Sequence, residues 1–185
     1  MADTQRSIAD VLALLADNSA GAISPQDLRD AIVTQHAAHG MLTVAAAASA
    51  LVTLADTVTY VEAAAPVWTL AASPLSTNFD ESGGNGRLTY IGAPTITVHI
   101  AVHVSISSVS NNRVLHLRVG LNGTTDATSE IVRKTGTGGD IGAGTLGLLV
   151  SMATGDYISL FVLNETSADD VTIEAASLVA SGMPQ

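Results

Sequence analysis

The sequence contains no cysteine, which excludes disulfide scaffolds, thiol catalysis and cysteine-based metal sites. Charged residues make up 13 % of the chain, roughly half the usual share. Lys and Arg together number only seven against seventeen Asp and Glu, which gives a formal net charge of −10. Because so few cations can release counterions from a phosphate backbone, nucleic acid is excluded as the main partner.

Aromatic residues are also scarce, at 3 %, although hydrophobic residues reach 47 %. The apolar content is therefore mainly Ala, Val, Leu and Ile, and the surface is expected to be covered by small polar residues. Long apolar runs are missing as well, since Val44–Leu54 is interrupted by Ser49 and Thr53. That stretch is too short for a membrane span, so no membrane insertion is expected. The first residues also lack the order of charges and apolar residues that marks a secretory signal.

Residues 4–34 have the pattern of two short helices. In the first, the apolar residues Ile8 to Leu15 recur at the spacing of one helix face. The second is predicted to begin after Ser24, because Ser suits the N-cap, Pro25 suits the first helical position and Asp27 can bond back to the cap. Gly40 is expected to end this helical unit.

Two helices this short cannot bury an apolar stripe alone. The stripe either packs on the domain that follows or docks into another protein. We interpret residues 1–40 as an anchoring segment and residues 41–185 as a separate head domain. The residues expected to form the anchor are Ile8, Val11, Leu12, Leu15, Leu28, Arg29 and Ile32.

Beyond Met41 the hydrophobic period changes from helical to alternating, which predicts β-strands. The clearest strand is Thr95–Ser107, whose opposite face carries His99 and His103. Ala45–Ala50 is ambiguous between strand and helix. The chain is therefore predicted to be mainly β, an antiparallel jelly-roll sandwich preceded by a short α-helical segment. The other predicted strands are Thr57–Val61, Leu115–Leu121 (followed by a hairpin turn at Asn122-Gly123), Ala127–Lys134, Leu146–Met152, Tyr157–Asn164 and Val171–Val179.

The order of these segments resembles the heads of tumour-necrosis-factor and complement-type jelly rolls, over roughly Met41 to Gln185. The resemblance rests on Arg87–Gly92, the long strand that follows, and the stretch Leu149–Leu160 with its central Gly155-Asp156. It implies a homotrimer in which the long strand lies in the sheet that faces the axis. His99 and His103 would then lie at or near the subunit interface. Because imidazoles gathered by threefold symmetry repel one another once protonated, such a trimer should weaken below about pH 6.

The segment Asp17–Asp30 is similar to one found near the start of phage head-fibre, decoration and tail-fibre proteins. It implies a structural protein of a bacteriophage virion, either a capsid decoration or a head fibre. Residues 1–40 would bind the major capsid protein or another virion protein. The location implied is the virion surface, after assembly in the host cytoplasm. A tail-fibre tip that binds a host receptor or surface glycan is the alternative.

No motif supports an enzyme or a cofactor. Gly142–Gly147 matches the dinucleotide fingerprint as a string, but a strand rather than a helix is predicted to follow it, so we interpret it as part of a Gly-rich loop. His36 and His39 fit one helix face, yet no third ligand lies near them. Metal binding by His99 and His103 would need further ligands, which a trimer axis could provide. We therefore expect neither catalytic residues nor a metal site within one chain.

Overall fold

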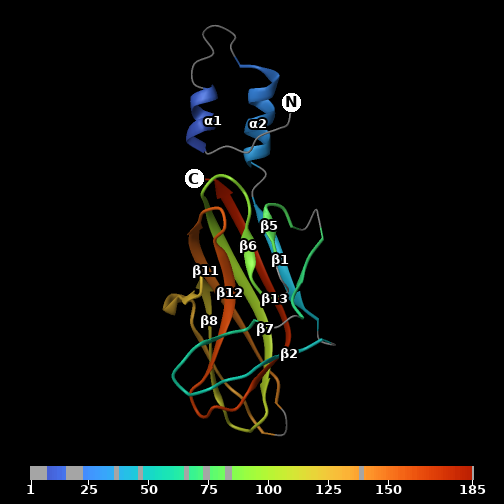
Figure 1. The fold of residues 1–185 in the computed structure, drawn as a ribbon, viewed down its shortest axis with the longest axis vertical. Coiled ribbons are helices and arrows are strands. Elements are labelled where there is room, and N and C mark those ends of the chain that lie inside the picture. Colours follow the sequence, from blue (N-terminus) through green and yellow to red (C-terminus); the bar gives the residue numbers. More distant parts are fainter. Residues whose placement is uncertain are drawn as a thin grey trace.

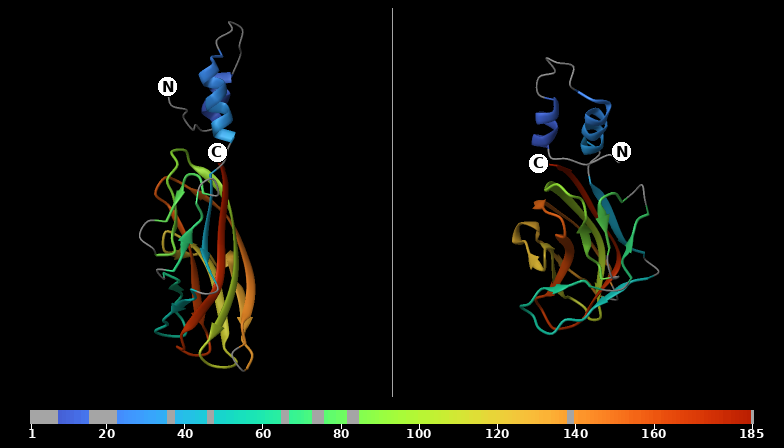
Figure 2. Two further views of the ribbon diagram at one scale, coloured as in Figure 1. Left: turned by 90° about the vertical axis from the view of Figure 1, so that its right-hand side faces the viewer. Right: turned by 45° about the horizontal axis from the view of Figure 1, so that its top comes forward.

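The computed structural model describes residues 8–15, 23–35, 38–45, 48–64, 67–72, 76–81, 85–137 and 140–184. It consists of two antiparallel sheets packed face to face, with two helices at one end of the sandwich (Figure 1). Two further views show that the helices lie at the same end as the C-terminus (Figure 2). The expected fold, a mainly β sandwich preceded by helices, is thus confirmed. Neither described helix is long and apolar enough to cross a membrane.

The first sheet has the strand order β11-β7-β13-β1-β4, and the short strand β2 also pairs with β13. These strands span Gly142–Met152 (β11), Ile96–Ser108 (β7), Val171–Pro184 (β13), His39–Val44 (β1), Thr69–Leu70 (β4) and Ala50–Val52 (β2). The second sheet has the order β10-β8-β12-β6-β5, with β3 on β12 and β9 on β8. Its strands span Ile131–Lys134 (β10), Val114–Leu121 (β8), Tyr157–Asn164 (β12), Leu88–Tyr90 (β6), Phe79–Asp80 (β5), Val61–Glu62 (β3) and Thr124–Thr125 (β9).

Strict alternation in β7 produces one dry face and one wet face, as the sequence predicted. The apolar residues at every second position face the other sheet and are buried, and Val102 is 0 % exposed. The same strand pairs with β13 along its whole length and with β11 from Ile96 to Ile106, so it lies between these two strands in the first sheet. The residues of β7 that alternate with the buried ones point outward, to the opposite surface of the first sheet.

The predicted turns form where backbone chemistry favours them. Asn122 and Gly123 have φ angles of 51° and 81°, the left-handed values that a tight hairpin between β8 and β9 requires. At the start of helix α2 (Pro25–Gln35), the Ser24 amide donates to Asp27 Oδ2 at 2.8 Å and the Asp27 amide donates to Ser24 Oγ at 3.1 Å. These reciprocal bonds are the expected capping box.

Four local predictions were wrong. Thr57–Tyr60 is not a strand, because Oδ1 of Asp56 accepts hydrogen bonds from the amides of Val58 (2.9 Å) and Thr59 (2.6 Å) and closes a turn. Ala127–Lys134 begins with a 3₁₀ turn, η1 (Ala127–Ser129), capped by Asp126, before β10 starts. Gly40 does not end the helical unit but lies inside β1, and His39 lies in that strand rather than on a helix. Its suggested partner, His36, lies outside the described residues.

The fourth wrong prediction concerns the glycines of Gly142–Gly147, which were expected to belong mainly to a loop. They lie within β11, where a side chain on Gly144 would collide with Ile131, and one on Gly142 would collide with Arg133. The glycines therefore allow the edge strand β10 of one sheet to pack closely against β11 of the other. No helix opens after them, so the string does not form a dinucleotide site.

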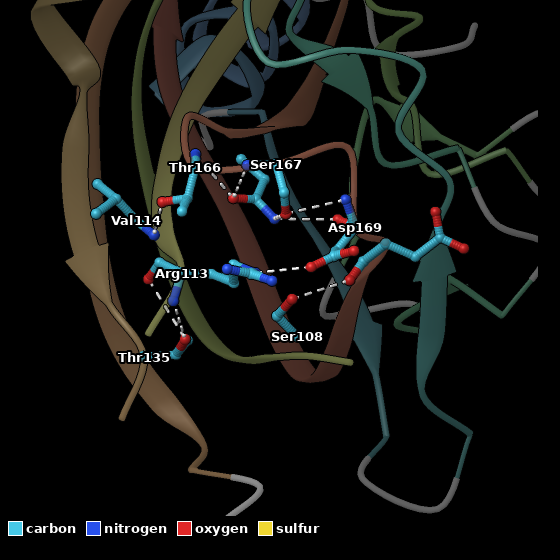
Figure 3. A network of polar contacts seen from close by, with 9 residues as sticks. Ser108, Arg113, Val114, Thr135, Thr166, Ser167 and Asp169 are labelled. Carbon is cyan, nitrogen blue, oxygen red and sulfur yellow. Dashed lines mark hydrogen bonds and ion pairs between the residues drawn. The ribbon is translucent and has the colours of Figure 1, made fainter. Parts of the chain in front are cut away.

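The loops at the end of the head opposite the helices are joined by a polar network (Figure 3). Arg113 Nε donates to Asp169 Oδ2 at 2.7 Å, and the Val114 amide donates to Thr166 Oγ1 at 2.9 Å. Buried Asn164 accepts from the amides of the β12–β13 loop and donates to its carbonyl at Asp169. The Arg113 amide also donates to Thr135 Oγ1 at 3.0 Å. These bonds connect the loops that join β7 to β8, β10 to β11 and β12 to β13.

Candidate functional site

On the outward surface of the first sheet, the strands β11, β7, β13 and β1 carry no Asp, Glu, Lys or Arg between the ends nearest the helices and the cross-strand row that contains Ser105. We call this surface the neutral face. Register places its residues in cross-strand rows, such as Gly147, Ala101, Val179 and Met41. The neutral face consists of Ala143, Thr145, Gly147, Leu149 and Ser151 (β11), Thr97, His99, Ala101, His103 and Ser105 (β7), Ala175, Ser177, Val179, Ser181 and Met183 (β13), and His39, Met41 and Thr43 (β1).

A charge-free surface of this extent is unusual on a chain with a net charge of −10. Leu149 and Met183 lie on it with 66 % and 60 % of their surface exposed. Exposed apolar side chains among small, uncharged neighbours mark interaction sites, because the core of a protein interface is depleted of charge. His99 and His103, for which the family resemblance implies a position at or near a subunit interface, are both exposed on this face.

A shallow hollow of about 570 Å³ lies in the neutral face beside His103. Its floor is low because the facing residues of three strands, Ala143, Ser105 and Ala175, are all small. His103 Nδ1 lies 3.2 Å from Oγ1 of Thr145, its cross-strand neighbour on β11. The hydroxyl therefore holds the imidazole beside the hollow.

The outward surface of the second sheet is ionic instead. His116 on β8 lies between two carboxylates, with Nδ1 2.9 Å from Glu130 and Nε2 3.0 Å from Glu165. The Tyr60 hydroxyl also donates to Glu130, and the Arg118 guanidinium stacks 4.3 Å from the centre of the Tyr60 ring. Hydrogen bonds from Tyr60, His116 and Arg118 lower the pKa of Glu130 to about 2. Since Glu130 joins Tyr60, His116 and Arg118 on this surface, the cluster fits a role in holding the Tyr60 loop on the sheet.

This cluster predicts a pH dependence of stability. Burial lowers the pKa of His116, but the hydrogen bonds to Glu165 and Glu130 outweigh it, so the pKa is raised above the ordinary value of 6.5. A group whose pKa is raised in the folded state contributes stabilising free energy that is fully present below the ordinary pKa. That contribution is lost as the pH rises through the folded-state pKa. We expect wild type to melt above His116→Gln by a larger margin at pH 5.5 than at pH 8. Equal margins in a thermal melt at the two pH values would contradict the ion pairing.

The helices form a hairpin in which part of the predicted anchor is uncovered. In α1 (Ile8–Leu15), Leu12 is 63 % exposed and Val11 is half-buried; in α2, Leu28 is 55 % exposed. Arg29 is exposed and donates to Gln26 Oε1 at 2.7 Å. The side chains of the remaining anchor residues, Ile8, Leu15 and Ile32, lie outside the described part of the structure.

Among the described residues, no group of three His, Asp or Glu side chains is placed to hold a metal ion. The only Trp of the sequence, Trp68, is 3 % exposed, and its Nε1 donates to the Ala63 carbonyl at 2.8 Å. It is therefore a core residue that cannot stack on a sugar. Sequence reasoning placed His99 and His103 but missed the neutral face around them, because that face is assembled from strands far apart in the chain.

The chain was compared with known proteins. No family model matches it, and no curated protein matches its sequence. Among solved structures, it is similar to the PRD1 vertex protein P5, with a TM-score of 0.52 and 11 % identity over 79 % of this chain and 96 % of that one. It is also similar to the Eiger TNF of S. frugiperda, with a TM-score of 0.51 and 10 % identity over 80 % of this chain and 94 % of that one. The chain therefore has a TNF-like jelly-roll fold.

Proposed function

We propose that this chain is a structural protein of a bacteriophage virion, a capsid decoration or head-fibre protein. The helical hairpin attaches it to the major capsid protein or another virion protein, and the jelly-roll head projects as a homotrimer from the virion surface. The fold shared with the PRD1 vertex protein supports the proposal, as does the similarity of Asp17–Asp30 to the start of phage fibre and decoration proteins. The proposal includes no enzymatic activity and no cofactor.

The neutral face is the observation that carries the proposed trimer. A monomer has no need for a broad surface that lacks charge while the other sheet carries ion pairs. Most soluble homo-oligomers have closed rotational symmetry. In a cyclic trimer, rotation about the threefold axis leaves all three copies pointing the same way along that axis. Three copies joined along this face would present three helical hairpins at one end and three sets of loops at the other.

The position of the hairpin supports its proposed role as an anchor. It lies at the end of the head where β13 finishes, so the polar loop network of Figure 3 lies at the far end. Leu12 and Leu28 are the exposed large apolar residues of its described part. Their burial against a particle protein would contribute about 1.5–3 kcal/mol each.

We expect Leu12→Ser/Leu28→Ser to bind particles at least about tenfold more weakly while the head keeps its β-rich spectrum. Deletion of residues 1–35 should abolish binding and leave β1 whole, since that strand starts at His39. Co-sedimentation with purified particles that lack the protein measures both effects. Val109→Ser, a change to a 70 % exposed residue at the far end, is the matched control and should bind normally. Normal particle binding by the deletion variant would refute the anchor.

The alternative function is a tail-fibre tip that binds a host receptor or glycan. The observation that favours it is the hydrogen-bonded loop network around Arg113 and Asp169, which would hold a recognition surface away from the anchor. Immunogold labelling of intact virions separates the two proposals directly. Label over the head shell supports decoration or a head fibre, whereas label at the tail end supports the alternative.

A further inference from the structure

The two ring nitrogens of His103 have different surroundings on the neutral face. Its Nδ1 is held by Thr145 Oγ1 at 3.2 Å, and among the described residues its Nε2 has no hydrogen-bond partner. Metal-binding histidines characteristically donate one ring N–H to a neighbouring group, which orients the ring. A hydroxyl can accept such a bond, so the Thr145 contact is compatible with the tautomer in which Nδ1 carries the proton and Nε2 can bind a metal. Nε2 is then available as one ligand, and a metal ion bound there needs further ligands.

One chain does not supply those ligands, since no three-ligand group is present among the described residues. Threefold symmetry would supply them by repeating His103 around an axis. The residues beside it on the same face, Ala101, Ser105 and Ser177, are small, and the adjoining hollow measures about 570 Å³. Other copies of the imidazole can therefore approach without displacing bulky side chains.

We infer that three His103 Nε2 atoms, one from each chain of the proposed homotrimer on which this inference rests, bind one Zn²⁺ ion on the threefold axis. Three imidazoles with a water in the fourth position are a recurrent tetrahedral arrangement for zinc. The neutral face contains no carboxylate, so it does not suit Mg²⁺ or Ca²⁺, which require oxygen ligands. The ion would hold the three chains together.

His99 provides the matched control within the same strand and face. Its cross-strand neighbours are Leu149 and Ser181, and among the described residues its ring has no hydrogen-bond partner. The hollow lies beside His103 and not beside His99. The inferred site therefore needs His103 and its Thr145 contact but does not need His99.

The test uses the untagged full chain after EDTA treatment, with equilibrium dialysis against Zn²⁺ and a thermal melt. We expect one Zn²⁺ per three chains and a rise in melting temperature with Zn²⁺ concentration. Co²⁺ in its place should give the intense visible bands of tetrahedral coordination. His103→Gln should lose all three signals and His99→Gln should keep them. Thr145→Val should bind at least about tenfold more weakly, because the ring loses its orienting partner.

Light scattering on the same samples separates this inference from the proposed function. A trimer that takes up no Zn²⁺ overturns the metal site and leaves the trimer standing. A monomer in the absence and presence of Zn²⁺ overturns both. Zn²⁺ uptake that is unchanged in a folded, trimeric His103→Gln variant also overturns the site, because the ion must then bind elsewhere.

Discussion

Replacing Val102 by Asp is expected to unfold the head. Val102 is 0 % exposed at the centre of β7 and faces the second sheet. A carboxyl group there has no described polar partner and must either stay charged in an apolar core or take up a proton, and both outcomes cost several kcal/mol. A domain of ordinary stability has only about 5–15 kcal/mol in total. Circular dichroism and urea denaturation at pH 7 measure the loss.

Ala101→Asp is the control for that experiment, because residue 101 precedes Val102 and points to the opposite surface of the same sheet. The isolated chain should tolerate this carboxylate in water and keep its fold. If Val102→Asp had the same urea midpoint as wild type, the assignment of the two faces of β7 would be wrong.

The same Ala101→Asp variant is expected to break the homotrimer. Ala101 lies in the middle of the neutral face, next to Gly147 and Val179. Three carboxylates would then be brought together in a surface with no described cation to pair them. Because like charges at an interface cost several kcal/mol, the dissociation constant should rise at least about a hundredfold. Sedimentation velocity across a concentration series measures this shift.

Val132→Asp is the matched control for the interface prediction. Val132 is 58 % exposed on β10 of the second sheet. The substitution therefore adds the same charge to a surface outside the proposed interface. This variant should associate like wild type. Equal weakening by both variants would mean that net charge, rather than the neutral face, controls association.

Strands were predictable where a single strand carries its own signal. Tyr157–Asn164 has the bounds predicted from the sequence, and the long strand was displaced by only one residue at each end. In both, alternation or a continuous apolar run fixes which side chains are buried. The wrong strand at Thr57–Tyr60 has a local cause as well. Its β-branched residues imitate a strand, while the turn depends on one carboxylate, Asp56.

The candidate site was only partly predictable because it depends on pairing between distant segments. The sequence placed His99 and His103 on the polar side of β7, and the structure agrees. It did not show that Thr145 lies beside His103 or Val179 beside Ala101, because those neighbours follow from the register of β11 and β13. Nor did it reveal that the residues of the neutral face lack charge on all four strands.

The mass of the 185-residue chain in solution tests the central claim most directly. Multi-angle light scattering at micromolar concentration and pH 7 should give the mass of three chains of 18.7 kDa each. Ala101→Asp should give the mass of one chain under the same conditions. A wild-type mass of 18.7 kDa would contradict the account, because the neutral face would then be exposed to water in the working protein.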